Sequence, residues 1–293
     1  MLKPDRTASL REVLDPLYDG FNHPDSALDP IQIVRRHERL DDREIIAFVA
    51  AALAFGRVAS VMASIEAMCR VIGSEPAAFV RAFDPSRDGR PLASLVHRWT
   101  RGADFVALLW ILRQLIERHG SLEAAFAAGV DPSAPDFGPA IDDFSARARA
   151  VDLRPAYGRR VPARPGVFYF FTQPSTGAAC KRLNLFLRWM IRKDRVDPGG
   201  WTRLSPRQLV VPLDTHTIRV GRCLRLTRRA SPGWKMATDI TAGLRALDPD
   251  DPVRYDFSLC HLSMMGACGW HTTRGNRACP LREVCRPARP GKT

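Results

Sequence analysis

The chain has 293 residues, and its 45% hydrophobic content is enough for the core of one large domain or two smaller ones. Its 44 Lys and Arg residues exceed its 31 Asp and Glu residues, which gives a formal net charge of +13. This charge favours a polyanionic partner such as nucleic acid, although heavy arginine usage in a GC-rich genome would give the same composition. No stretch approaches the roughly 18 to 20 apolar residues that span a bilayer, and the first ten residues lack a signal-peptide core. We therefore expect a cytoplasmic, nucleoid-associated protein without membrane contact.

Helical patterns dominate the first half of the chain. The stretch DDREIIAFVAAALAFG, residues 41–56, begins with Asp41 and Glu44 at the spacing of a capping box and continues as an almost wholly apolar helix that ends at Gly56. Two amphipathic stretches, 59–73 and 104–120, end in the same way at a glycine. No strand-like alternation competes with these patterns, so the sequence predicts an all-α fold.

Residues 130–165 are rich in Pro, Asp and Arg and predict a surface insertion around one short helix, AIDDFSARARA. The next stretch, GVFYFFTQPSTGAACKRLNLFLRWMIRK, combines an aromatic run, a turn signal and an amphipathic helix. This pattern predicts Lys181 in the first turn of the helix. Backbone N–H groups at such a start can bind an anion, with Lys181 and Arg182 beside it, but a tight turn with a surface lysine would show the same pattern.

The stretch VVPLDTHTIRV, residues 210–220, places Asp214 between an apolar run and a second helical pattern. The position suits a helix N-cap, in which the carboxylate accepts backbone N–H groups. Arg219, Arg222 and Arg225 follow at three-residue intervals and fall along one side of that helix, facing either phosphate or water.

A family resemblance joins these two stretches. LDTHTIRV resembles the Val-Asp-Thr-His-x-x-Arg-Val signature of helix-hairpin-helix DNA glycosylases of the endonuclease III and 8-oxoguanine DNA glycosylase type. GAACKRLN resembles the hairpin of that superfamily followed by its Lys-x-x-Asn pattern. The chain as a whole, including AFGRVASV and HGSLEAAF, resembles a bacterial branch known mainly as a domain of unknown function.

The resemblance implies two helical domains with a helix-hairpin-helix motif and an active-site cleft between them. Residues 43–195 would form a helical-barrel domain that ends in the hairpin and the Lys181 helix, and residues 1–42 and 196–293 would form the second domain. The implied activity is that of a base-excision repair DNA glycosylase with AP-lyase activity on an oxidised base, with 8-oxoguanine as the first candidate. Lys181 would be the Schiff-base nucleophile and Asp214 its electrostatic partner.

The implied partner is double-stranded DNA with a damaged base, bound by a monomer. The implied DNA-binding residues are Arg57, Gly177, Arg182, His216 and Arg219, with Arg57 near the gap that a flipped base leaves. The chain departs from the family in two respects, because its hairpin QPSTGAACK has a single glycine and because Lys181 and Asp214 lie 33 positions apart. A non-catalytic DNA- or RNA-binding protein that retains the glycosylase fold is the alternative.

Seven cysteines in a chain of this size do not form a disulfide-scaffold pattern, and four of them lie in the last 34 residues. These four are Cys260, Cys268, Cys279 and Cys285. CPLREVC resembles the end of the iron–sulfur loop of the same glycosylases, whose usual spacing is Cys-x6-Cys-x2-Cys-x5-Cys, and Cys260 would replace the ligand missing at Asn276. The sequence leaves open a [4Fe–4S] cluster, a zinc ion or no metal. The remaining cysteines, Cys69, Cys180 and Cys223, are interpreted as small core residues.

Overall fold

A computed structural model of the protein describes residues 3–23, 25–26, 28–266 and 279–285. The described part is mostly helical, which confirms the all-α prediction apart from one pair of two-residue strands. The α-helices are α1 (Pro4–Phe21), α2 (Ile31–Val34), α3 (Leu40–Leu53), α4 (Val58–Ile72), α5 (Pro76–Ala82), α6 (Pro85–Asp88), α7 (Gly102–His119), α8 (Leu122–Ala127), α9 (Gly138–Arg149), α10 (Arg154–Tyr157), α11 (Lys181–Ile191), α12 (Thr215–Cys223), α13 (Trp234–Arg245) and α14 (Asp256–Met264). The strands are β1 (Val96–His97) and β2 (Thr100–Arg101), and the 3-10 helices are η1 (Arg90–Leu92), η2 (Gly166–Phe170), η3 (Pro174–Thr176) and η4 (Pro206–Gln208).

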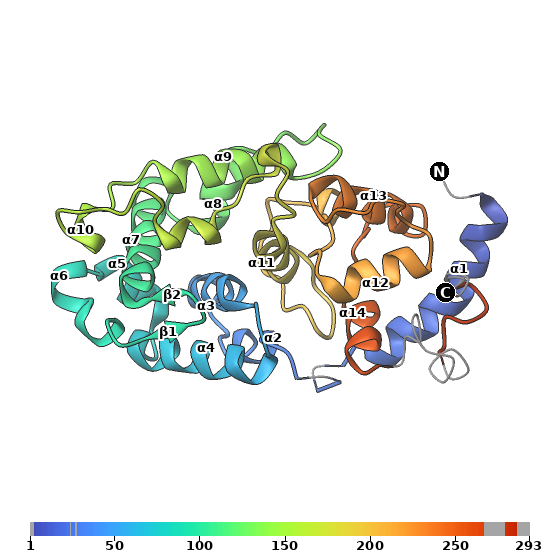
Figure 1. Ribbon diagram of the computed structural model, residues 1–293, viewed down its shortest axis with the longest axis horizontal. Helices are drawn as coiled ribbons and strands as arrows, with labels where there is room; N and C mark the ends of the chain where they lie inside the picture. The colour runs from blue at the N-terminus through green and yellow to red at the C-terminus, as the bar shows by residue number, and fades with distance from the viewer. Residues whose placement is uncertain (1–2, 24, 27, 267–278, 286–293) are drawn as a thin grey trace, which may run out of the picture.

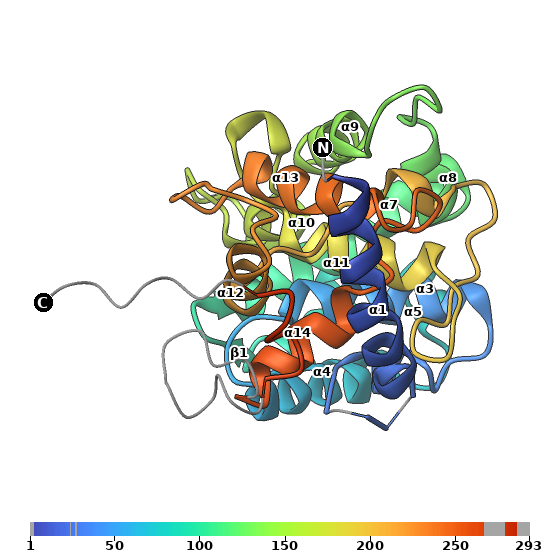
Figure 2. The same ribbon diagram turned by 90° about the vertical axis from the view of Figure 1, so that its right-hand side faces the viewer.

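Helix α11 lies in the middle of the molecule. Figure 1 shows helices α4 to α10 on one side of it and helices α1, α12, α13 and α14 on the other. Helix α3 packs against α11, and α2 packs against α3. On the opposite side α14 packs against both α12 and α1, and α1 runs across the front of this group in Figure 2. Helix α11 therefore contributes to the packing of both groups of helices.

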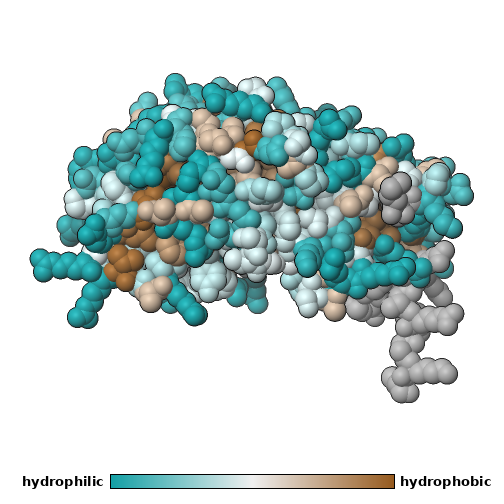
Figure 3. Space-filling view, turned by 90° about the horizontal axis from the view of Figure 1, so that it is seen from above, coloured by the Kyte–Doolittle hydropathy of each residue, from teal (hydrophilic) through white to brown (hydrophobic). Residues whose placement is uncertain are grey.

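The core around α3 and α11 is rich in aromatic rings. Phe48 of α3 lies 5.0 Å from Phe186 of α11 and 5.4 Å from Phe171, measured between ring centroids. Residues 45–53 of α3 are all buried, which confirms the prediction of a helix covered nearly all round. The face in Figure 3 is mainly hydrophilic, with smaller apolar patches between polar side chains. None of the described helices is long and apolar enough to cross a membrane.

The ends of the predicted helices agree with the structure in part. Gly73 and Gly120 follow α4 and α7 with φ angles of 84° and 90°, a conformation that glycine adopts without a steric penalty. The predicted capping box of α3 is wrong, since its N-cap is Arg39 and makes no side-chain capping bond. Glu44 instead accepts hydrogen bonds from the backbone N–H groups of Leu122 and Glu123 at the start of α8. A long-range contact thus replaces the local one, because Glu44 lies on a buried turn of α3.

The segment 196–208, between α11 and α12, contacts helices on both sides of α11. Trp201 donates its indole N–H to Glu44 of α3, and Glu123 of α8 accepts from the backbone N–H groups of Thr202 and Arg203. The sequence assigned this segment to the same domain as α12. Its hydrogen bonds join it to α3 and α8, because the buried carboxylates of these helices need N–H donors. The carbonyl oxygen of Arg207 also accepts a hydrogen bond from Arg245 of α13, so the domain assignment of this segment stays a prediction.

Candidate active site

Lys181 is the first residue of α11, as the sequence predicted. It follows η3, Gly177 with a left-handed φ of 84°, and Cys180 with a φ of 49°. Its ammonium group donates a hydrogen bond to the carbonyl oxygen of Ala54, at 3.0 Å, directly after α3. The same Nζ lies 3.7 Å from Oδ2 of Asp214, and the side chains of the pair are 30% and 21% exposed. The structure therefore brings together two residues that are distant in sequence.

Asp214 uses its two carboxylate oxygens for different contacts. Oδ1 accepts the backbone N–H groups of His216 and Thr217, both at 2.9 Å, which confirms that Asp214 is the N-cap of α12. Oδ2 faces Lys181 and also lies 3.8 Å from the thiol sulfur of Cys260 on α14. The cap fixes the carboxylate in place, because a side chain held at one oxygen cannot rotate away from the lysine.

A cavity of about 310 Å³ opens beside this pair. Helix α11 lines one wall with Lys181, Leu185 and Arg188, whose i, i+4 and i+7 spacing places them on one face. The other lining residues come from the α3–α4 connection, from the N-terminal region and from α12 and α14: Leu28, Asp29, Pro30, Ala54, Gly56, Arg57, Val58, Val61, Pro212, Asp214, His216, Asp256, Phe257, Cys260, His261 and Met264. Both groups of helices around α11 thus form the cavity.

A buried ion network lies behind the cavity. Arg188 donates to Asp256 of α14 at 2.7 Å and to Asp197 at 3.0 Å. Arg192, one turn further along α11, also contacts Asp197 and pairs with Asp251 at 2.9 Å. The network holds α11 against α14, and so fixes Lys181 relative to Asp214 and Cys260. Sequence reasoning missed Arg188 and Asp256, although Arg188 lies seven residues after Lys181 and so on the same helix face.

Burial changes the protonation of several groups that line the cavity. It raises the pKa of Asp256 to about 6, although Arg188 opposes the shift, and the charge of Asp214 adds to it. It also raises the pKa of the Cys260 thiol well above its usual value, helped by Asp214 and Asp256, which keeps this thiol protonated at neutral pH. Burial lowers the pKa of His261. Oδ1 of Asp256 has no hydrogen-bond partner among the described residues.

The residues predicted to contact DNA occupy different surroundings. Arg57 is exposed and lines the cavity, directly before α4. His216 also lines it, with Nδ1 3.2 Å from the hydroxyl oxygen of Ser263. Arg219, one turn further along α12, is half-buried and does not line this cavity. Gly177 lies in a separate hollow beside Arg229 and Lys235, and its carbonyl oxygen accepts the backbone N–H of Trp234.

Arg182 lies under the ring of Phe55, with its guanidinium carbon 4.3 Å from the ring centroid. It donates a hydrogen bond to the carbonyl oxygen of Tyr169, and burial lowers its pKa to about 10. The sequence predicted that Arg182 contacts DNA directly. The structure shows that Arg182 contacts the Phe55 ring and the Tyr169 backbone, and its contact with DNA stays a prediction.

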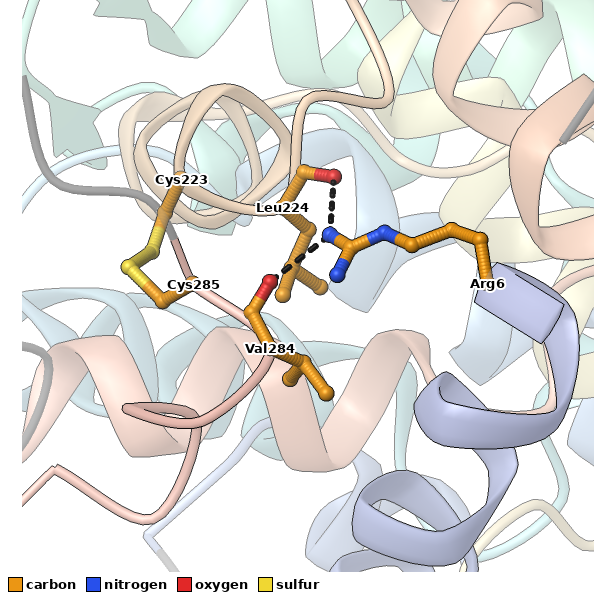
Figure 4. The surroundings of a disulfide bond; sticks show 5 residues. All are labelled: Arg6, Cys223, Leu224, Val284 and Cys285. Carbon is orange, nitrogen blue, oxygen red and sulfur yellow. Dashed lines mark hydrogen bonds between the residues drawn. A yellow bond between two sulfur atoms is a disulfide. The ribbon is translucent and has the colours of Figure 1, made fainter. Parts of the chain in front are cut away.

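The structure separates the cysteines of the predicted metal site. Cys260 lies in the cavity beside Asp214, whereas Cys285 forms a disulfide with Cys223 of α12 (Figure 4). Cys223 is buried, which confirms its interpretation as a core residue, but the sequence did not predict its bond to Cys285. Arg6 of α1 donates to the carbonyl oxygens of Leu224 and Val284 next to this bond.

Cys279 is buried and free, and Cys268 lies outside the described residues. Among the residues that the structure describes, no three His, Cys, Asp or Glu side chains are arranged to hold a metal ion. The [4Fe–4S] cluster, its zinc alternative and the absence of a metal therefore stay predictions from the sequence.

Comparison with known proteins adds the family. No curated protein matches the chain, and no solved structure matches it. One family model does match, over residues 29–265, which cover every described residue that lines the cavity except Leu28. The match spans well over half of the chain, so the chain belongs to the family described as "Protein of unknown function (DUF2400)".

Proposed function

We propose that this protein is a helix-hairpin-helix DNA glycosylase with AP-lyase activity, that α11 follows its hairpin, and that it excises an oxidised base. One observation carries the proposal: Nζ of Lys181 and Oδ2 of Asp214 lie 3.7 Å apart at a cavity, although the residues are 33 positions apart in the sequence. An amine nucleophile beside a fixed carboxylate suits attack at a sugar carbon. The two groups of helices around α11 would be the two domains of such an enzyme.

The reaction assigns one task to each side chain. Asp214 would accept a proton from the Lys181 ammonium, and the free amine would then attack C1′ of the flipped nucleotide. The C1′–N bond to the base breaks, and the base leaves with the bonding electron pair and the proton that Asp214 took from Lys181, which returns Asp214 to its carboxylate form. As it gives this proton to the base, Asp214 would regain its negative charge and stabilise the positive charge that develops on the sugar and the attached amine. The C1′–O4′ bond would then break as a proton passes from the attached nitrogen to O4′, which opens the sugar and leaves a protonated imine at Lys181. Loss of a C2′ proton from this imine would expel the 3′ phosphate by β-elimination.

The cavity suits a flipped base in size and lining. Its volume of about 310 Å³ lies at the lower end of the ~300–1,000 Å³ range of small-molecule pockets. Leu185, Val61 and Phe257 supply apolar surface, whereas Asp256 and Arg188 supply polar groups at its inner wall. An extrahelical base needs this combination, because its ring faces are apolar and its edges form hydrogen bonds. 8-Oxoguanine is the first candidate substrate.

Borohydride trapping tests the proposal directly. The wild type and the Lys181→Gln variant would be incubated with borohydride and duplexes that carry 8-oxoguanine, oxidised pyrimidines or an abasic site. We expect a covalent protein–DNA adduct with the wild type and none with Lys181→Gln. Lys193→Gln is a matched control, because Lys193 is an exposed lysine just after the same helix.

Two results would overturn the proposal. One is the absence of any adduct across the whole set of duplexes, and the other is an adduct that Lys181→Gln forms as readily as the wild type. If the protein binds these duplexes without reacting, it is the non-catalytic nucleic-acid-binding protein that the altered hairpin QPSTGAACK left open.

A further inference from the structure

Three aromatic side chains form a row on the surface next to the cavity. Phe55 lies between Ala54 and Gly56, two residues that line the cavity. The ring of Trp99 lies 4.7 Å from the ring of Phe55, and the ring of Tyr169 lies 6.0 Å from that of Trp99, between centroids. Trp99 is 47% exposed and Tyr169 is 56% exposed. We call Phe55, Trp99 and Tyr169 the aromatic row.

Trp99 stands at the tip of a hairpin with a strained turn. His97 pairs with Thr100, so Arg98 and Trp99 form a two-residue turn. Arg98 has a φ of 54°, in a region that glycine favours at the first position of such turns. A non-glycine residue is strained there, and such strain is found most often at functional sites.

The hairpin is also fixed to the edge of the cavity. The imidazole of buried His97 lies within hydrogen-bonding distance of the hydroxyl oxygen of Ser64 at 2.9 Å and of the carbonyl oxygen of Phe55 at 3.0 Å. The guanidinium of Arg182 supports Phe55 from below, 4.3 Å from the ring centroid. The aromatic row is thus continuous with the wall that holds Lys181, because Lys181 donates to Ala54 beside Phe55.

Exposed arginines border the aromatic row, and the nearby carboxylate of Asp104 is buried. Arg57, Arg98 and Arg101 are exposed beside it, and the guanidinium carbon of Arg98 lies 5.5 Å from the ring centroid of Trp99. No Asp or Glu occurs in the three segments that contain the aromatic row, which are residues 53–58, 95–101 and 166–172. Exposed rings bordered by cations match the apolar faces and the phosphates of an unstacked nucleotide.

We propose that the aromatic row stacks on an unpaired nucleobase of the DNA whose flipped nucleotide enters the cavity. This inference rests on the proposed function for its substrate, and it adds a second base-binding surface outside the catalytic pair. A base–aromatic stack stabilises a complex enough to change its affinity by about tenfold. The row would therefore favour duplexes that contain an unpaired base.

Equilibrium binding tests this inference without requiring catalysis. The probes are a fully paired duplex and the same duplex with one bulged 2-aminopurine, and binding is followed by fluorescence anisotropy in the Lys181→Gln background. We expect the bulged duplex to bind about tenfold more tightly, with quenching of 2-aminopurine emission upon stacking. Trp99→Ala should remove most of both effects, Tyr169→Ala part of them, and Trp99→Phe little of them.

Trp110→Ala is the matched control. Trp110 also pairs with an arginine, since Arg113 lies 5.4 Å from its ring centroid. It stands on α7, does not line the cavity, and donates its indole N–H to the backbone carbonyl oxygen of Asp152. Circular dichroism would verify that each variant folds. Equal binding of the two probes by the starting protein, or an undiminished preference in Trp99→Ala, rejects the inference.

The two proposals fail in different ways. One result is that the protein prefers the bulged probe through Trp99 and yet forms no borohydride adduct. This result would support base stacking by the aromatic row and reject the proposed glycosylase activity. If the protein forms the borohydride adduct but binds both probes equally, the result would support the glycosylase activity and reject base stacking by the aromatic row. If the exposed rings of the row serve instead as a contact for another protein, neither probe will respond to Trp99→Ala.

Discussion

Lys181 and Asp214 meet with 3.7 Å between Nζ and Oδ2, while the other oxygen of the same carboxylate caps α12. One side chain thus links the start of α12 to the start of α11. The cap and the contact with the lysine depend on different atoms, so substitutions can separate them.

Asp214→Asn should keep the fold and lose the reaction. Asparagine caps a helix about as well as aspartate, so the free energy of unfolding should change little, whereas loss of the charge should slow single-turnover adduct formation about 10²- to 10⁴-fold. Asp214→Ala should slow it similarly and also cost about 1 kcal/mol of stability in urea unfolding. An Asn variant that reacts as fast as the wild type would contradict the role of this carboxylate.

Arg188→Met should destabilise the protein strongly. The substitution removes the guanidinium that pairs with both Asp256 and Asp197, which stay buried. Removing one partner of a buried ion pair lowers the free energy of unfolding by about 3 to 5 kcal/mol. Urea unfolding of the variant measures the loss. Arg207→Ala is the control, because its contact with Asp250 is exposed to solvent on both sides and should add nothing measurable. Equal midpoints for the two variants would show that the buried network does not hold α11 and α14 together.

Asp256 should make stability depend on pH between about 4 and 6. Its carboxyl has a pKa of about 6 in the folded protein against 3.8 for the free side chain, so in this window the folded state binds a proton that the unfolded chain has released. The contribution of this group to the free energy of unfolding is therefore largest below about pH 4 and falls as the pH rises to about 6. Urea unfolding of the wild type and of Asp256→Asn at several pH values in this range measures the contribution. If the two curves of unfolding free energy against pH stay parallel, Asp256 does not cause the pH dependence.

The Cys223–Cys285 disulfide should stabilise the oxidised protein. It closes a loop across a sequence separation of 62, and a bond of this kind typically contributes about 2 to 4 kcal/mol. Under non-reducing conditions the free energy of unfolding of Cys285→Ser should be lower than that of the wild type by this amount. In the presence of a reductant the two proteins should be equally stable. Peptide mapping without reductant should recover the linked pair. Iron bound through Cys285 in anaerobically purified protein would instead support the four-cysteine cluster predicted from the sequence.

Local patterns determined much of this protein. Apolar periodicity predicted the buried helix α3 and the helix that begins at Lys181, because a helix with apolar residues at these spacings must bury them. The position of Asp214 before a helical pattern predicted its capping role, which is a contact within four residues. These features can be predicted from the sequence, because they depend on residues that are only a few positions apart.

Long-range contacts were decided only by the tertiary structure. Glu44 fits a local capping box by its spacing, yet it accepts hydrogen bonds from α8, because the packing of α3 left N–H donors there to be satisfied. Cys285 bonds to Cys223 and not with its sequence neighbours. The aromatic row joins residues 55, 99 and 169, which no periodicity relates. The sequence alone thus determined that α3 and α11 are helical and that Asp214 caps α12, whereas packing decided which side chains meet at the cavity.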